Sequence, residues 1–422
     1  MQEKLATPKS KLQATEDWTV VILGFMVIGL FVAGLEINIP SYKWSQWSEI
    51  GKVVSPQSLF GILQQFVLVY ALILFGNLIM RKPIKGVIKT FPIVFLLTVF
   101  ALIVAGNAFM KEMGLEAVIF SLLIGLFVGN VFTLPKWLKD ALSAELYVKI
   151  GLVLLGTSVI FSDILEAGTL GLVQSLIVVL SVWYFAFWLC KKLKVDDELT
   201  MMISSAVSIC GVSAAIATSG AIKGDQKKLS YVVSMVLITA IPMMLGMPYL
   251  AKMMGLSQEV TGAWLGGSID TSGAVVASGS LVGDRALEIS TIVKFSQNVL
   301  LGVAALAISI YWTYKGAPSG SSVEKPSMKI IWERFPKFVL GFIAASLLFS
   351  FYLTPETVTN VKGSIKEMQT VWFALAFTSI GLETNFKDLI GNNNLKPFMA
   401  FLTAQFFNII ITLLIAMWLF NN

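Results

Sequence analysis

The chain has 422 residues, of which 56% are hydrophobic and only 13% are charged. Soluble globular domains carry about 25% charged residues, so this composition excludes a soluble protein and indicates an integral membrane protein. The sequence contains no histidine, which excludes histidine-dependent zinc sites, catalytic triads and proton relays. The net charge of +6 comes from residues scattered over short loops, so it does not indicate nucleic-acid binding. The two cysteines, Cys190 and Cys210, lie in apolar runs, which excludes a disulfide framework.

Apolar runs long enough to cross a bilayer follow one another along the whole chain. A spanning helix needs roughly 20 residues, and apolar runs without period-two alternation are typical of helices rather than barrel strands. The uncharged runs are 18–35, 59–80, 90–110, 117–135, 169–190, 199–222, 230–251, 295–315 and 397–420, and the weaker ones are 146–162, 260–283, 338–355 and 368–382. We therefore predict an all-α polytopic membrane protein with about 11–13 transmembrane segments, two or more of them broken or re-entrant.

The N-terminal region and the loop charges predict the orientation. Residues 1–17 are polar, and no small-residue cleavage site follows the first apolar run, so we expect an uncleaved anchor. If every run crosses, roughly twice as many Lys and Arg residues fall on the side of the N terminus, which predicts a cytoplasmic N terminus. Lys223, Lys227 and Lys228 violate this pattern, which indicates that run 199–222 is not an ordinary straight span.

Two of the runs, at 208–220 and 267–279, are dense in small and hydroxyl-bearing residues. We interpret them as interrupted helices whose half-helix N-termini and hydroxyls bind an ion or an anionic substrate near the midplane. Close packing of small residues between helices is the alternative, and it needs no ligand. The carboxylate of Asp270 inside the second run favours a site. We expect both runs to unwind, near 210–213 and 270–273, with the two breaks facing each other.

A second similarity pairs residues 155–165 with residues 377–389, and each segment closes a short apolar run. A matched pair of short segments predicts internal, inverted repeats. The order along the chain is short, small-rich, small-rich, short, which is not the order of a simple tandem repeat.

Four passages resemble the YeiH-like sulfate exporter family of bacterial inner-membrane proteins, a branch of the bile acid, arsenite and riboflavin transporter superfamily. They are residues 147–168 (YVKIGLVLLGTSVIFSDILEAG), 209–218 (ICGVSAAIAT), 262–279 with the following Ile292, Val293 and Lys294, and 380–389 (IGLETNFKDL). The resemblance implies a transporter core over 114–422 with two discontinuous, crossing helices, and it leaves residues 1–113 as N-terminal scaffold helices. It also implies a location in the bacterial inner membrane. A linker is expected near 316–329, where Gly, Ser and Pro are frequent.

Two departures from the family bear on the substrate. Where the family usually shows Ile-His-Asp-Thr-Ser-Gln, residues 269–274 read IDTSGA, and where it often has Thr-Arg, this chain has Ser296 and Gln297. The missing histidine and arginine are groups that favour a doubly charged oxyanion. We therefore expect a site that prefers a monovalent or weakly hydrated anion, with sulfate as the nominal substrate of the family.

The candidate site residues come from the two small-rich runs and from polar positions in nearby apolar runs. The candidate substrate-binding residues are Ser208, Cys210, Gly211, Ser213, Asp270, Thr271, Ser272, Gly273, Lys294 and Gln297, and the candidate coupling-ion residues are Asp270, Thr378, Ser379 and Glu383. Lys294 is either an interfacial lysine or a countercharge to Asp270 or to the anion. We expect Lys149 to be structural, and Gln405 and Asn408 to form interhelical hydrogen bonds.

These features favour a secondary active transporter of a small anion such as sulfate or an organic sulfonate or carboxylate, coupled to H⁺ or Na⁺ and working by alternating access; export is the direction that the resemblance implies. No GxxxxGK phosphate-binding loop occurs, so ATP-driven transport would need a partner protein. We expect no cofactor, no metal site and no enzymatic activity. The expected partners are the anion and the lipid bilayer, with a homodimer left open. A membrane-embedded enzyme using Asp270, Lys294 and Cys210 is one alternative. A channel-like membrane subunit is the other.

Overall fold

The computed structural model describes residues 16–38, 40, 42–112, 117–222, 224–316, 332, 335–384 and 395–421. Within them the secondary structure is helical, and the only β pairing is an isolated bridge between Trp44 and Asn107. The chain divides into two compact units: unit 1, Met1–Ile160 with Lys337–Glu383, and unit 2, Phe161–Pro336 with Thr384–Asn422. The all-α prediction is therefore confirmed.

The chain passes between the units at 160/161, 336/337 and 383/384. The first and the last of these boundaries fall inside the paired segments 155–165 and 377–389, so the two similar passages mark two of the three points where the chain changes unit. The unit boundaries do not test the division expected after residue 113, which stays a prediction. Most of the expected linker at 316–329 lies outside the described residues.

Unit 1 is a helical bundle in which glycines allow close approach. A Cβ on Gly125 of α6 would lie 2.3 Å from the carbonyl oxygen of Thr378, and a Cβ on Gly381 would lie 2.5 Å from that of Leu122. The backbones of α6 and α18 are therefore in direct contact, as is common for membrane helices. The helices of unit 1 are α1 (Glu16–Val32), η1 (Trp47–Glu49), α2 (Ile50–Val53), α3 (Pro56–Ile79), α4 (Ile84–Ala105), α5 (Ala108–Glu112), α6 (Ala117–Val131), α7 (Lys136–Lys139), α8 (Ala144–Leu155), α17 (Lys337–Leu347), η3 (Leu348–Tyr352) and α18 (Pro355–Glu383).

Lys149 of α8 joins three parts of unit 1 through ion pairs. Its ammonium lies 2.9 Å from Asp17, 2.9 Å from Glu145 and 3.4 Å from Glu16. Asp17 also accepts a hydrogen bond from the backbone N–H of Lys337, the first residue of α17. Lys149 thus holds the starts of α1, α8 and α17 together, which fits the structural role expected for it.

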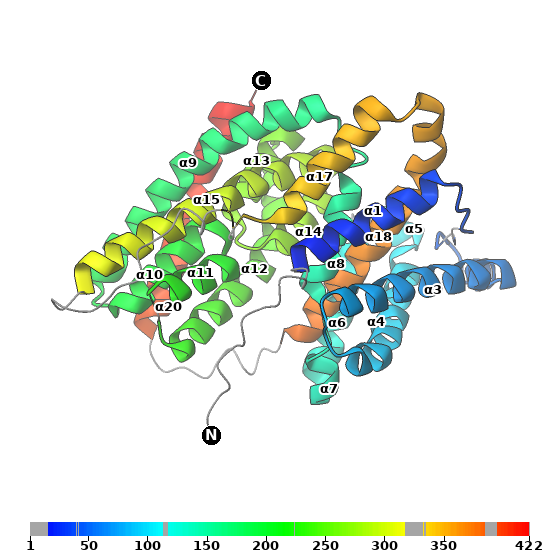
Figure 1. Ribbon diagram of the computed structural model, residues 1–422, viewed down its shortest axis with the longest axis horizontal. Coiled ribbons are helices and arrows are strands. Elements are labelled where there is room, and N and C mark those ends of the chain that lie inside the picture. The colour runs from blue at the N-terminus through cyan, green and yellow to red at the C-terminus, as the bar shows by residue number, and fades with distance from the viewer. Residues whose placement is uncertain are drawn as a thin grey trace. The chain divides into compact units, whose positions relative to one another are not determined.

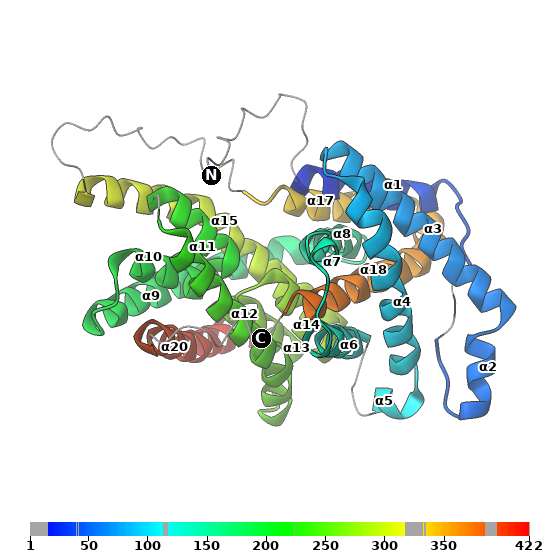
Figure 2. The same cartoon turned by 90° about the horizontal axis from the view of Figure 1, so that it is seen from below.

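Unit 2 contains long helices and two pairs of short ones (Figures 1 and 2). The long helix α9 packs against α15 and α20. Helix α15 also packs against three of the short helices, α11, α13 and α14. The helices of unit 2 are α9 (Phe161–Lys192), α10 (Asp197–Ser205), η2 (Ala206–Cys210), α11 (Val212–Ile222), α12 (Gln226–Met253), α13 (Gln258–Ser268), α14 (Ser272–Val282), α15 (Asp284–Gly316) and α20 (Leu395–Phe420).

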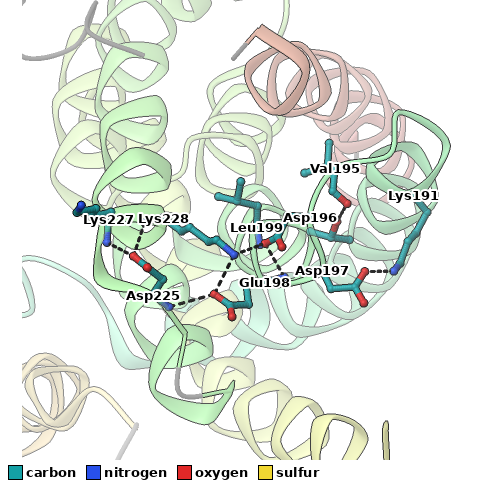
Figure 3. A network of polar contacts seen from close by, with 10 residues as sticks. Lys191, Val195, Asp196, Asp197, Glu198, Leu199, Asp225, Lys227 and Lys228 are labelled. Atoms are coloured by element: carbon teal, nitrogen blue, oxygen red, sulfur yellow. Dashed lines mark hydrogen bonds and ion pairs between the residues drawn. The ribbon is translucent and has the colours of Figure 1, made fainter. Parts of the chain in front are cut away.

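The first interrupted segment, α10–η2–α11, doubles back and forms a hairpin. Figure 3 shows its base, where the residues before α10 meet those after α11. The backbone N–H of Asp225 donates to Glu198 at 3.1 Å, and Lys228 pairs with Asp196 at 2.7 Å and with Glu198 at 3.3 Å. A straight segment of this length would separate its ends by about 35 Å. Both ends of hairpin 1 (α10–η2–α11) therefore lie on one side of the membrane.

The second interrupted segment, α13–α14, folds back in the same way. The backbone N–H of Ala286, just after the end of α14, donates to the side chain of Gln258 at the start of α13. Arg285 lies 3.6 Å from Glu259, which is also in the first turn of α13. Hairpin 2 (α13–α14) therefore also begins and ends on one side. The interruption of both segments is confirmed. Of the two forms expected for them, broken or re-entrant, both segments have the re-entrant one, because each pair of half-helices reverses direction.

The bases of the two hairpins lie at opposite ends of α15, as expected if the hairpins enter the bilayer from opposite sides. Helix α15 shows this, because a Cβ on Gly262 near the base of hairpin 2 would touch the backbone oxygen of Ala286, whereas Ile308 packs with Met201 and Ile222 near the base of hairpin 1. From Ala286 to Ile308 a helix rises about 33 Å, the thickness of a bilayer core. Helix α12 joins the two bases and is also long enough to cross.

By length and composition, six of the described helices could cross a membrane, and four shorter apolar helices accompany them. The six are α3, α4, α9, α12, α15 and α20. The four short helices include α11 and α14, the outgoing arms of the two hairpins. Two re-entrant hairpins among spanning helices agree with the expected polytopic fold.

Candidate functional site: the meeting turns of two hairpins

The turn of each hairpin lies where the sequence predicts a break. In hairpin 1 the π-helical turn η2 ends at Cys210, Gly211 has φ +53°, and α11 begins at Val212. In hairpin 2 the chain is extended at Ile269, and Thr271 caps α14 by accepting a hydrogen bond from the backbone N–H of Ala274. The second break therefore lies slightly earlier than expected, because the hydroxyl of Thr271 starts the next helix.

The two turns touch, as predicted. A Cβ on Gly211 would lie 2.9 Å from the Cβ of Asp270 and 2.7 Å from a methyl group of Val236. Gly211 therefore meets two requirements that only glycine satisfies without cost, a positive φ and the close approach of another turn. A larger residue would push the hairpins apart.

Four polar side chains from α15 and α20 bind the backbone carbonyl groups at the ends of α10–η2 and α13. The last carbonyls of a helix have no partner within it. Lys294 donates to the carbonyl oxygens of Ile209 and Ile269 at 2.9 and 2.8 Å. Equivalent bonds run from Gln297 to Ser208 and Gly267, from Asn408 to Val207 and Ser268, and from Gln405 to Ser268. We call Lys294, Gln297, Gln405 and Asn408 the clamp, because three of its members bridge the two hairpins.

The charge of Lys294 is balanced by this arrangement. Each half-helix C-terminus carries roughly half a negative charge, and the ammonium lies against two of them. Its third donor binds the side-chain oxygen of Gln297 at 2.8 Å. All three ammonium donors are therefore used by the protein. Lys294 is only 1% exposed, which excludes the interfacial, snorkelling alternative.

Asp270 lies where the two hairpin turns meet, beside the N-terminal ends of α11 and α14 and not beside the helix C-terminal ends that the clamp binds. It directly precedes the cap of α14, and it touches Gly211, which precedes α11. The N-termini of these half-helices carry partial positive charge, which favours an anion beside them. Asp270 is 2% exposed, and its Oδ2 has no hydrogen-bond partner among the described residues. No ion pair within 4.0 Å joins it to Lys294 in that part of the chain. Of the alternatives open for Lys294, a direct pair with Asp270 is therefore not formed, and a role as countercharge to a bound anion stays a prediction.

The other predicted substrate residues divide into a buried and an accessible group. Ser208 is fully buried and donates to the carbonyl oxygen of Ser204 in its own helix, and Cys210 is also buried. Ser213 is exposed, and Thr271, Ser272 and Gly273 are half-buried. The accessible residues all lie at the N-terminal ends of α11 and α14, on the same side of the meeting turns as Asp270.

The other predicted coupling-ion residues belong to unit 1. Thr378 receives a hydrogen bond from Thr98 at 2.9 Å, and the hydroxyl of Ser379 is buried without a hydrogen-bond partner in the described part of the chain. Glu383, the last residue of α18, accepts a hydrogen bond from the backbone N–H of Ala144. Their role in ion coupling stays a prediction.

Sequence reasoning did not assign Gln405, Asn408 or Asn298 to the site. Gln405 and Asn408 were expected only as interhelical hydrogen-bonding residues, which is correct, but their partners are the hairpin ends themselves. Asn298 donates to the hydroxyl of Ser272 at 3.3 Å. The available signal was the spacing of amide side chains within otherwise apolar helices, which places them on one helix face.

In comparisons with known proteins, the chain is similar in sequence to a set of bacterial membrane proteins. A family model described as "Conserved hypothetical protein 698" matches residues 89–401. A UPF0324 membrane protein of Rhodopirellula baltica is 40% identical over 390 residues, covering 90% of this chain and 71% of the relative. One from Nitratidesulfovibrio vulgaris is 38% identical over 340 residues, 78% of this chain and 58% of the relative's length. One from Nitrosomonas europaea is 26% identical and covers 92% of each chain. No solved structure matches the chain.

Proposed function

The chain belongs to the UPF0324 membrane protein family, and from that premise we propose that it is a secondary active transporter of a small anion in the bacterial inner membrane. The observation that supports transport is the meeting of two oppositely inserted hairpins around a buried carboxylate. Irregular backbone at membrane depth is stable only where protein or a water-filled cavity surrounds it. Broken segments of this kind commonly form transporter binding sites.

The anion would bind at the accessible N-terminal ends of α11 and α14. Backbone N–H groups of the first helical turns and the hydroxyls of Ser213, Thr271 and Ser272 are available as neutral donors there. No arginine lies in this turn region of the sequence. The site therefore suits sulfate less well than a monovalent sulfonate or carboxylate, although the resemblance to sulfate exporters keeps sulfate among the substrates to test.

Asp270 supplies the reason for coupling. A buried, ionised carboxylate that is not fully hydrogen-bonded costs several kcal/mol, and Asp270 Oδ2 has no hydrogen-bond partner among the described residues. The ionised Asp270 would also repel an anion bound at the same turns. Binding of a cation, H⁺ or Na⁺, at Asp270 removes both costs. The anion and the cation therefore bind favourably together, and this linkage couples their movement.

The hairpin topology also supports an N-terminus in the cytoplasm. Both flanks of hairpin 1 lie on one side, so Lys227 and Lys228 join Lys191 and Lys192 instead of opposing them. The exception to the positive-inside pattern thereby disappears. The export direction stays part of the proposal.

The alternatives receive less support from the same contacts. A membrane enzyme using Lys294 as a base or nucleophile needs a free amine, but the ammonium donates to three protein oxygens. A channel requires a continuous path, whereas the turns are packed against each other at Gly211.

Reconstitution into proteoliposomes tests the proposal. Wild-type protein should accumulate a labelled sulfonate, carboxylate or sulfate against its gradient when a Na⁺ or H⁺ gradient is imposed. Asp270→Asn should abolish accumulation while leaving a folded protein, and Ser278→Ala should not, because the Ser278 hydroxyl bonds only within its own helix. Equal, gradient-independent flux through both variants would favour a channel. Full coupled transport by Asp270→Asn would show that Asp270 is structural.

A further inference from the structure

The turn of hairpin 2 gathers buried oxygen atoms that no donor satisfies. Ser268 Oγ, Asp270 Oδ2 and Asn298 Oδ1 each lack a hydrogen-bond partner among the described residues. All three residues are at most 7% exposed. Buried polar groups are paired in more than nine cases in ten, so three orphaned oxygens at one turn need an explanation.

These oxygens belong to neighbouring groups. Ser268 and Asp270 flank the extended residue Ile269, and the amide of Asn298 is anchored to the same turn by its hydrogen bond to Ser272. The amide of Gln405 binds the carbonyl oxygen of Ser268, and it is also a hydrogen-bonding neighbour of the Asp270 carboxylate. The amide donors of Gln405 and Asn298 therefore already have partners, and the three oxygens are left without one.

We propose that the turn of hairpin 2 is a binding site for one Na⁺ ion, with Asp270, Ser268 and Asn298 as side-chain ligands. This inference rests on the proposed function, because the ion would be the coupling ion of the same transporter. Carboxylate, hydroxyl and amide oxygens are the hard ligands that such a cation prefers.

The separation of the orphaned oxygens favours a metal cation over a proton. A protonated Asp270 and the Ser268 hydroxyl are both donors, but none of the three oxygens has a hydrogen-bond partner among the described residues, so they are not bonded to one another. A cation lying between them can contact all three. It would also neutralise Asp270 directly, whereas the ammonium of Lys294 donates its hydrogen bonds to Ile209, Ile269 and Gln297.

The charge and space at the turn favour Na⁺ over other ions. Asp270 is the sole carboxylate in the turn sequence 267–273, so its single negative charge would balance only half the charge of a divalent ion. No group of three or more acidic, cysteine or histidine residues suited to a metal occurs in the described chain. The turn is tightly packed against Gly211, which disfavours larger cations such as K⁺.

Na⁺ binding to purified protein in detergent tests this site without any transport. Equilibrium binding of ²²Na⁺, or a thermal shift with NaCl against choline chloride and KCl at equal ionic strength, should give saturable binding to wild type. Asp270→Asn should abolish it, and Asn298→Leu should weaken it at least tenfold. Ser278→Ala, a hydroxyl loss in the same hairpin away from the turn, should bind as wild type.

The outcomes separate this site from the proposed function. Wild-type Na⁺ affinity in both Asp270→Asn and Asn298→Leu overturns the site. Proton-driven anion accumulation by a wild type that binds no Na⁺ also overturns the site and leaves the transporter intact. Na⁺ binding that Asp270→Asn abolishes, in a protein that accumulates no anion, supports the site and contradicts the proposed function.

Discussion

Replacing Lys294 with methionine tests whether the clamp holds the two hairpins together. The change keeps most of the side-chain volume but removes the hydrogen bonds to Ile209, Ile269 and Gln297. An orphaned buried polar group costs about 1–3 kcal/mol, so three of them would cost about 3–9 kcal/mol. Removing a buried ammonium returns part of this cost, which leaves an expected loss of about 3–5 kcal/mol.

A loss of this size lowers the melting temperature by roughly 6–20 °C, at about 2–4 °C per kcal/mol for a chain of a few hundred residues. The assay is thermal unfolding of the purified protein in detergent. Lys252→Met is the matched control, because Lys252 is exposed and the chemical change is identical. Gln297→Leu should be destabilised in the same direction as Lys294→Met. Equal melting temperatures for Lys294→Met and Lys252→Met would refute the clamp.

Three further predictions follow from other contacts. Gly211→Ala should destabilise the protein by about 1–3 kcal/mol, because alanine at φ +53° is strained and its Cβ would lie 2.7 Å from Val236. The control Gly246→Ala has open space around the new Cβ and should be neutral in the same melting assay. Gly125→Ala should separate α6 from α18, because its Cβ would lie 2.3 Å from the carbonyl oxygen of Thr378. It should therefore lower the yield of folded, monodisperse protein in size-exclusion chromatography. The control Gly363→Ala, with open space around its Cβ, should leave that yield unchanged. At the base of hairpin 1, burial raises the pKa of Asp196, but hydrogen bonds from Lys228 and from the backbone of Leu199 and Glu198 outweigh it and hold the pKa below its ordinary value. The pair therefore stabilises the fold at neutral pH, and this contribution is lost as the pH falls through the folded pKa of Asp196. Because both side chains are partly exposed, we expect less than about 1 kcal/mol, reduced by salt and absent in Asp196→Asn, as measured by pH-dependent melting.

The positions of the breaks could be predicted because their cause is local. Gly211 and the sequence Asp270-Thr271-Ser272 combine backbone freedom with hydroxyls that cap or replace helical hydrogen bonds. The poor fit of Lys227 and Lys228 to the positive-inside pattern also indicated that hairpin 1 is not a straight span. These signals lie within a few residues of the features they predict.

The sequence left open whether the interrupted segments cross the membrane or return, because the choice depends on contacts between residues far apart in the sequence. Glu198 meets Asp225 and Gln258 meets Ala286 only after the half-helices have folded back. A run of 24 apolar residues has the same composition whether it crosses or returns. Nothing in the local pattern therefore distinguished crossing helices from hairpins.

The clamp was missed for a similar reason. Gln405 and Asn408 are separated from hairpin 2 by more than 100 residues, and any amide in an apolar helix satisfies the description of an interhelical hydrogen bond. Lys294 was singled out as a charge, but its partners are backbone carbonyls, which leave no signature in the sequence. The structure shows Lys294 bonded to both hairpins, and its role as a substrate ligand stays a prediction.

Accessibility of single cysteines in sealed membrane vesicles tests the opposed hairpins most directly. Lys192→Cys and Lys227→Cys flank hairpin 1, and Lys252→Cys and Asp284→Cys flank hairpin 2, all at exposed positions. The native Cys190 and Cys210 are buried, so the unmodified chain gives the background labelling. With a membrane-impermeant maleimide, the first pair should be labelled from one face and the second pair from the other. Labelling of Lys192→Cys and Lys227→Cys from opposite faces would show that α10–η2–α11 crosses the membrane and would contradict the account.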